Sequence, residues 1–82
     1  MKYLAKIEVS LKPGHSDPEG ETTKRSLRDL NYEVIEVRTM KVYLITLNAD
    51  SLEQAKEKLD EMCVRLLSNP VKDNYSYEIL ES

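Results

Sequence analysis

The reactive side chains of this 82-residue chain are few and far apart. Its one cysteine, Cys63, falls on the apolar stripe of an expected helix, where a neutral buried thiol is the usual state. A nucleophilic cysteine instead needs an electropositive, partly exposed setting. The one histidine, His15, lies in an expected loop with no evident pairing to Cys63. We expect Cys63 to pack in the core, and the role of His15 stays open.

The acidic residues, the possible metal ligands and the candidate phosphate loop also give no evidence of a catalytic or binding site. The acids of the second expected helix alternate with bases, as Glu53, Glu57, Asp60 and Glu61 stand among Lys56, Lys58 and Arg65. This pattern favours a solvated helix face over an acid–base pair. One cysteine and one histidine are too few for a tetrahedral zinc site. Lys12-Pro13-Gly14 lacks the spacing of a phosphate loop. We therefore expect no catalytic, cofactor-binding or metal-binding residue in this chain.

The charge and hydropathy of the chain restrict the cellular compartments and the classes of partner that we expect. Twelve Lys and Arg against fifteen Asp and Glu give a net charge of −3, without the basic stripe of a nucleic-acid binder. The N-terminus lacks the apolar region of a signal peptide. No apolar run approaches the roughly 20 residues of a membrane helix. These features predict a cytoplasmic protein with no nucleic-acid or membrane partner.

Two helices have clear starts. Asp17 suits an N-cap and Pro18 the first helical position. Gly20 costs about 1 kcal/mol of helix propensity, which suggests a close backbone approach there. In this helix we expect Thr23, Leu27 and Leu30 to face the core. The second helix begins at Asp50-Ser51-Leu52-Glu53, where Glu53 is expected to reach back to the cap.

Four segments have the character of strands. Alternation from Tyr3 to Leu11 and from Tyr75 to Ile79 indicates half-buried strands. Val34–Thr39 and Val42–Leu47 are β-branched and apolar, and we expect them to pair as a hairpin through Thr39-Met40-Lys41, although the Asn-Gly turn signal is missing. The order predicts one α+β domain over residues 1–82. Its fold would be ferredoxin-like β-α-β-β-α-β, a four-stranded antiparallel sheet with two helices on one face.

One strand is apolar on both sides, at Val42, Tyr43, Leu44 and Ile45. A sheet covered by helices on one face should alternate more cleanly, so we expect these residues to mediate self-association. Small domains also need such support, because a chain of this size buries only roughly 60–65% of its unfolded surface. A single cysteine excludes an internal disulfide. A homodimer or homotetramer is the expected form.

Several short stretches together resemble the family of PurS, the small subunit of phosphoribosylformylglycinamidine synthase. The resemblance runs from about Lys2 to Glu81 and rests on the order and spacing of the pieces. They are Leu11-Lys12-Pro13-Gly14, Asp17-Pro18-Glu19-Gly20, Leu30-Asn31-Tyr32-Glu33, Met62-Cys63 with Leu66-Leu67, Asn69-Pro70-Val71 and Tyr75-Ser76-Tyr77-Glu78. The chain departs from the family pattern at His15-Ser16 and at Met40, both in expected loops.

The resemblance implies an accessory role in purine biosynthesis. Such a subunit joins a glutaminase and a large ATP-dependent synthetase, which convert formylglycinamide ribonucleotide, glutamine and ATP to formylglycinamidine ribonucleotide. The small subunit would bring the two together and assist ammonia transfer without catalysing a step itself, and ATP and Mg would belong to the synthetase. The candidate partner contacts are Lys12, Pro13, Gly14, Asp17, Pro18, Gly20, Asn69 and Pro70.

Two other functions share the expected order of elements. An ACT-like regulatory module would bind an amino acid between subunits near the first strand–helix turn. An RNA-binding domain would stack bases on exposed aromatic residues of the middle strands, and Tyr43 is the available candidate. Fold alone cannot choose among these functions. The resemblance favours the accessory subunit.

Overall fold

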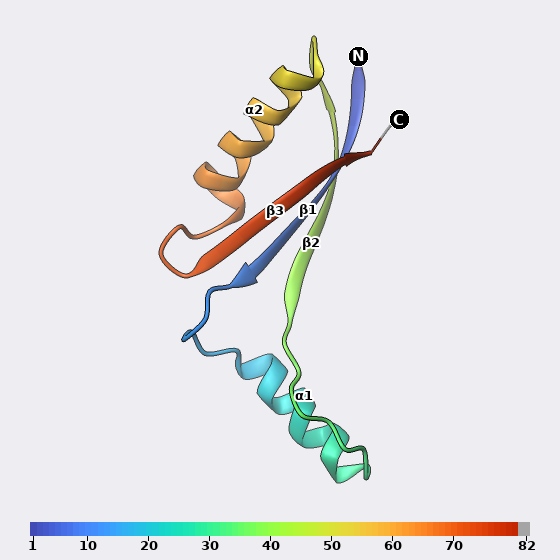
Figure 1. Ribbon diagram of the computed structural model, residues 1–82, viewed down its shortest axis with the longest axis vertical. Coiled ribbons are helices and arrows are strands. Elements are labelled where there is room, and N and C mark those ends of the chain that lie inside the picture. Colours follow the sequence, from blue (N-terminus) through green and yellow to red (C-terminus); the bar gives the residue numbers. More distant parts are fainter. Residues whose placement is uncertain (81–82) are drawn as a thin grey trace.

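The computed structural model describes residues 1–80, so the last two residues of the domain expected over 1–82 lie outside it. The elements in chain order are β1 (Lys2–Leu11), α1 (Pro18–Asp29), β2 (Met40–Asn48), α2 (Leu52–Met62), the short π-helix η1 (Cys63–Leu67) and β3 (Asp73–Leu80). Within this part of the chain, β1 is the central strand of one sheet. It pairs antiparallel with β2 on one side and with β3 on the other (Figure 1).

The expected four-stranded ferredoxin-like sheet is wrong, since residues 1–80 form a sheet of three strands. The expected strand Val34–Thr39 does not form, and no hairpin joins it to β2. Met40, expected in the turn, is the first residue of β2 and pairs with Ser10 of β1. The physical reason is turn chemistry, because tight hairpins need residues that accept positive φ, and Thr39-Met40-Lys41 offers none.

The core lies between one face of the sheet and α2. It is formed by Ala5, Ile7 and Val9 of β1, Leu47 of β2, Ala49 just after that strand, and Ala55, Leu59 and Cys63 of α2 and η1. The predicted alternation of β1 and the core position of Cys63 are confirmed. The apolar stripe expected along the second helix is confirmed only in part, since Ala55, Leu59 and Cys63 are buried but Leu52 and Leu66 are 45% and 82% exposed. The helix start needs one correction. Ser51 accepts from the backbone N–H of Gln54, and the Gln54 side chain, not Glu53, reaches back to the Asp50 N–H.

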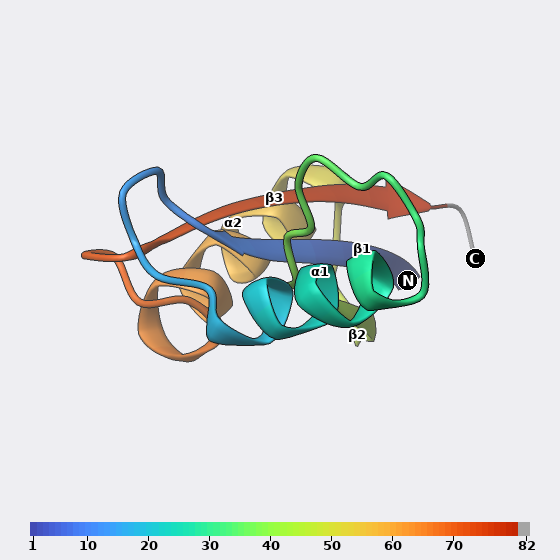
Figure 2. The same cartoon turned by 90° about the horizontal axis from the view of Figure 1, so that it is seen from below.

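Helix α1 lies apart from this core. Its capped start at Asp17-Pro18 is confirmed, but its expected core stripe is wrong, since Thr23 is exposed, Leu27 is half-buried and Leu30 is 67% exposed. The helix extends beyond the end of the sheet, and the following segment returns beside it (Figures 1 and 2). We call residues 18–39 the arm. The arm explains a radius of gyration of 16.3 Å, against about 12 Å for a compact domain of this length.

Candidate functional site

Two loops far apart in sequence meet at one end of the sheet. The Lys12 backbone N–H donates to the Lys72 carbonyl at 2.7 Å, and Lys12 Nζ donates to the Pro70 carbonyl at 3.0 Å. Asn69 shapes the second loop, because its side-chain oxygen accepts from the Val71 N–H at 2.9 Å. The structure therefore brings Lys12, Asn69 and Pro70 together, with Pro13 and Gly14 following Lys12. We call residues 12–14 and 69–72 the loop pair.

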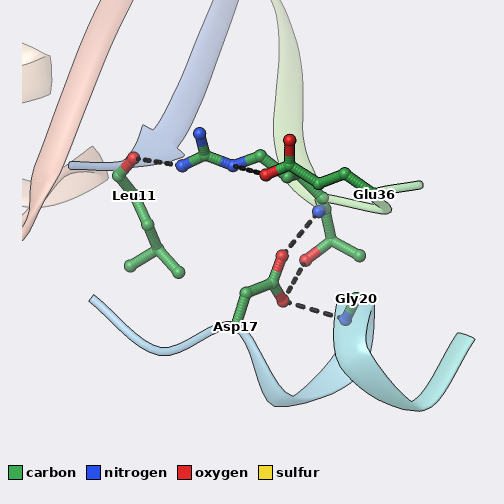
Figure 3. A network of polar contacts seen from close by, with 6 residues as sticks. Leu11, Asp17, Gly20 and Glu36 are labelled. Atoms are coloured by element: carbon green, nitrogen blue, oxygen red, sulfur yellow. Dashed lines mark hydrogen bonds and ion pairs between the residues drawn. The ribbon is translucent and has the colours of Figure 1, made fainter. Parts of the chain in front are cut away.

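The other three partner-contact candidates, Asp17, Pro18 and Gly20, lie at the base of the arm. Asp17 Oδ1 accepts from the Gly20 N–H at 3.0 Å and from Thr39 Oγ1 at 2.8 Å, and Asp17 Oδ2 accepts from the Thr39 N–H at 2.7 Å (Figure 3). These bonds, the one from the Thr39 N–H foremost, lower the pKa of Asp17. One carboxylate thus caps α1 and ties it to the start of β2.

Gly20 and Arg38 complete the base of the arm. A Cβ on Gly20 would lie 2.5 Å from the Val37 carbonyl oxygen, so the expected close backbone approach is confirmed. Arg38 Nη2 donates to the Leu11 carbonyl at 3.1 Å (Figure 3). Farther along the arm, Arg28 Nε donates to the Val34 carbonyl at 3.1 Å. Helix α1 and residues 34–39 are therefore held together as one unit.

Replacing Asp17 with Asn should loosen this junction while keeping the helix cap. An asparagine oxygen still accepts from the Gly20 N–H, but its NH₂ group cannot accept from Thr39. We expect hydrogen exchange at the Thr39 amide to speed up in Asp17→Asn, while the Gly20 amide stays protected. In the parent protein the folded pKa of Asp17 lies below its ordinary value of 3.8. The Asp17 carboxylate therefore contributes its full stabilisation of the fold above pH 3.8, and this stabilisation is lost as the pH falls through the folded pKa.

An NMR titration of the Thr39 and Gly20 amide shifts checks this assignment. Both shifts should move together at acidic pH, with a midpoint below 3.8. Asp17→Ala is the matched control, because it removes the cap as well and should expose both amides. Equal protection of Thr39 in Asp17→Asn and in the parent would contradict the role of Asp17.

The self-association candidates of β2 separate onto two faces. Tyr43 and Ile45 are half-buried and pack against the core. Val42 and Leu44 are 49% and 69% exposed on the opposite face, which α2 does not cover. Met40 extends this exposed apolar strip at 51%. We call Met40, Val42 and Leu44 the open strip. Beside it on β1, Lys6 and Glu8 form an ion pair at 3.6 Å.

The reactive residues lie in ordinary structural settings. Cys63 is fully buried, and burial raises the pKa of its thiol, with a further contribution from the Asp60 charge. His15 is exposed in the loop before α1. Residues 1–80 hold no group of three or more His, Cys, Asp or Glu placed to bind a metal ion. None of their helices has both the length and the apolar character needed to cross a membrane.

One polar cluster was not anticipated from the sequence. The phenol groups of Tyr75 and Tyr77 on β3 donate to the two oxygens of Asp60 on α2, at 3.3 and 3.2 Å. Burial and the charge of Asp60 raise the pKa of both phenols. The alternation of Tyr75 and Tyr77 placed them on one face of a strand, but the sequence did not show which helix residue faced them. The cluster ties β3 to α2.

The site is thus made of contact surfaces: a loop pair, an open strip and an arm outside the core. Together with the fold, they define a small α+β protein suited to contact with other chains. Residues 4–81 match the family model of PurS, described as phosphoribosylformylglycinamidine (FGAM) synthase. The chain belongs to the PurS family.

Individual relatives agree with this assignment over nearly the whole chain. The PurS subunit of Methanothermobacter thermautotrophicus is 40% identical over 81 residues, covering 99% of this chain and 96% of the relative. That of Archaeoglobus fulgidus is 45% identical over 74 residues, with 89% and 92% covered. A chain in the structure of PurLQS from Thermotoga maritima superposes with a TM-score of 0.89 at 31% identity, covering 98% and 99% of the two chains. These matches favour the accessory subunit over the ACT-like and RNA-binding alternatives.

Proposed function

We propose that this chain is the small subunit of a phosphoribosylformylglycinamidine synthase complex of purine biosynthesis. It brings a glutaminase subunit and a large ATP-dependent synthetase subunit together and assists ammonia transfer between them. ATP and Mg bind to the synthetase, and the complex works in the cytoplasm. The observation that carries the proposal is the close likeness, over nearly its full length, to a chain of the PurLQS structure.

The loop pair is the proposed contact with the larger subunits. It combines two lysines, two prolines and a glycine in a short, internally hydrogen-bonded surface. Gly14 has a φ of 89°, and nothing lies within 4 Å of where its Cβ would be. Such a loop keeps its shape without burying side chains of its own. It therefore presents a fixed surface to a partner, which lowers the entropy cost of binding.

The open strip is the proposed site of self-association, giving a homodimer or homotetramer. Its three apolar side chains line one exposed strand face. Contiguous exposed apolar surface of this kind is typical of protein contact sites. A second copy is a fitting occupant, since closed twofold assemblies are the commonest oligomers.

The proposed function predicts that omitting this chain affects turnover with glutamine and turnover with ammonium salt differently. We expect this chain to co-purify with the glutaminase and synthetase subunits when the three are mixed. Omitting it should abolish most glutamine-dependent turnover, while turnover supported by added ammonium salt should persist. The reason is that free ammonia reaches the synthetase without a docked glutaminase. Initial rates with each nitrogen source, with and without this chain, check the prediction.

Two outcomes would count against the accessory role. Equal glutamine-dependent rates with and without the chain would show that the chain has no accessory role in the complex. Loss of ammonium-supported turnover would instead show that the synthetase needs the chain for its own activity. A family relative that restores the glutamine-dependent rate serves as the positive control.

A further inference from the structure

Strand β3 forms one edge of the sheet, and within residues 1–80 no strand pairs with its outer side. At its start, the Lys12 N–H donates to the Lys72 carbonyl, one pair beyond Leu11 and Asp73 in the register with β1. Bonded and non-bonded pairs alternate along an antiparallel ladder, so the even-numbered residues of β3 bond to β1. The odd-numbered residues direct their backbone N–H and C=O groups outward. Three of them have no partner for these groups in the described part of the chain: Tyr75, Tyr77 and Ile79.

The outer edge of β3 lacks the features that usually keep an edge strand from pairing with another chain. Proteins protect such edges with proline, with lysine or with a bulge. Residues 73–80 contain neither proline nor lysine, and their register with β1 runs one to one without a bulge. A partner that adds a strand to an exposed edge gains main-chain hydrogen bonds, and its alternate side chains supply specificity. This edge is therefore a template for an extended segment.

A hollow lies between this edge and the end of the second helix. Asp60 of α2 accepts from the phenols of Tyr75 and Tyr77, and Val64, about one turn further on, lines a hollow of about 250 Å³ together with Tyr75. Lys12 of the loop pair lines the same hollow. The hollow thus joins the edge of β3 to the surface proposed above as the contact with the larger subunits. One partner segment can reach both.

The charges along this edge favour a basic partner segment. Asp60 has no ion-pair partner in the described part of the chain, because the phenols that donate to it are neutral at physiological pH. The charged residues of β3 itself, Asp73 and Glu78, are both acidic. Side chains on one face of a strand recur every two residues. A Lys or Arg opposite Tyr77 therefore reaches Asp60, while the side chain two positions away lies beside the hollow.

We propose that an extended segment of the larger subunit that contacts the loop pair adds a strand along the outer edge of β3. The segment carries a Lys or Arg that faces Asp60 and, two positions away, an apolar side chain that fills the hollow. Backbone bonds from the outward residues of β3 hold the segment in place. The proposal rests on the accessory role proposed above, and it names the docking element and the chemistry of its occupant.

Hydrogen exchange in the assembled complex tests the strand addition. In this chain alone, the outward amides of Tyr75 and Tyr77 should exchange fast and the inward amides of Ser76 and Glu78 slowly. On mixing with the glutaminase and synthetase subunits, the outward amides should slow at least tenfold, while the inward amides change little. Mass spectrometry with fragmentation to single residues measures both sets.

Three results of this experiment would overturn the proposal in different ways. Unchanged outward amides in a complex that has assembled would overturn strand addition alone. Outward amides that become protected in this chain by itself, as its concentration rises, would show that the occupant is a second copy. Failure of the three subunits to assemble would overturn the accessory role and the strand addition together.

A pair of variants at Tyr77 isolates the backbone contribution. Tyr77→Pro removes one outward N–H, and an edge position of this kind accepts proline without losing a bond to β1. Tyr77→Ala is the matched control, because it removes the same phenol and keeps the N–H. By isothermal titration calorimetry, Tyr77→Pro should bind the larger subunits at least tenfold more weakly than Tyr77→Ala. Equal binding by the two variants would contradict pairing along β3.

A second pair tests the charge assigned to the segment. Asp60→Asn should weaken binding at least fivefold, because it removes the charge that the basic side chain faces. Glu61→Gln removes a charge from the next residue of the same helix, on the side that lines a hollow with Ile45 of β2, and should change binding less than twofold. Equal binding by Asp60→Asn and the parent would overturn the basic chemistry assigned to the segment.

Discussion

Replacing Leu59 with alanine should unfold much of this protein at physiological temperature. Leu59 is fully buried in the hydrophobic core of residues 1–80, where α2 meets β1. Leu→Ala at such sites costs about 2–5 kcal/mol, because the lost apolar contacts leave a cavity. A domain this small stands near the lower end of the roughly 5–15 kcal/mol typical of folded proteins. One core leucine is therefore a large share of the total stability.

Urea denaturation followed by circular dichroism measures the loss, at one fixed protein concentration because association adds to apparent stability. Leu52→Ala is the matched control. It makes the same chemical change in the same helix, but Leu52 is 45% exposed and belongs to no buried cluster. We expect its effect to stay below about 1 kcal/mol. Equal losses in the two variants would show that α2 is not anchored through Leu59.

The parts of the fold predicted correctly are those whose signals are local. The alternation of β1 matches the residues that are buried, and so does the middle of the apolar stripe of α2, at Ala55 and Leu59. The cap at Asp17 and the close approach at Gly20 were also visible in the sequence, since each depends on one residue type at one position. Asn31, just after the end of α1, has a positive φ of 71°, a conformation that asparagine accepts more readily than most residues.

The arm was predicted wrongly because its strand-like residues do not fix a pairing partner. Val34–Thr39 has the composition of a strand, but composition does not say which edge it pairs with. The one warning was the missing turn signal before Val42, and it identified the position where the hairpin fails to form. The stripe of Thr23, Leu27 and Leu30 was narrow, and a narrow stripe contributes little to holding a helix on its own sheet.

The sequence predicted which residues belong to the candidate site better than it predicted how they are arranged in space. Lys12 and Pro70 were both proposed as contacts, but only the antiparallel pairing of β1 and β3 brings their loops together. Asp17 and Gly20 belong instead to the junction of the arm. The Asp60 cluster could not be predicted from the sequence, because a helix carboxylate among alternating charges gives no sign that two tyrosines face it.

A glutamate in place of Leu44 should break the assembly of this chain with itself. Leu44 is the most exposed residue of the open strip, at 69%. Burying a carboxylate in an apolar contact costs several kcal/mol when no partner charge meets it. We expect the association constant to fall at least about a hundredfold, equivalent to ~2.7 kcal/mol. In a separate chain this position is largely exposed, so the fold itself should tolerate the glutamate.

Analytical ultracentrifugation should show a lower mass for Leu44→Glu than for the parent at the same concentration. Asn74→Glu adds the same charge to the same sheet face. It lies on β3, and β1 separates it from the open strip, so it should leave the mass unchanged. An unchanged mass in Leu44→Glu would show that the open strip contacts something other than a second copy.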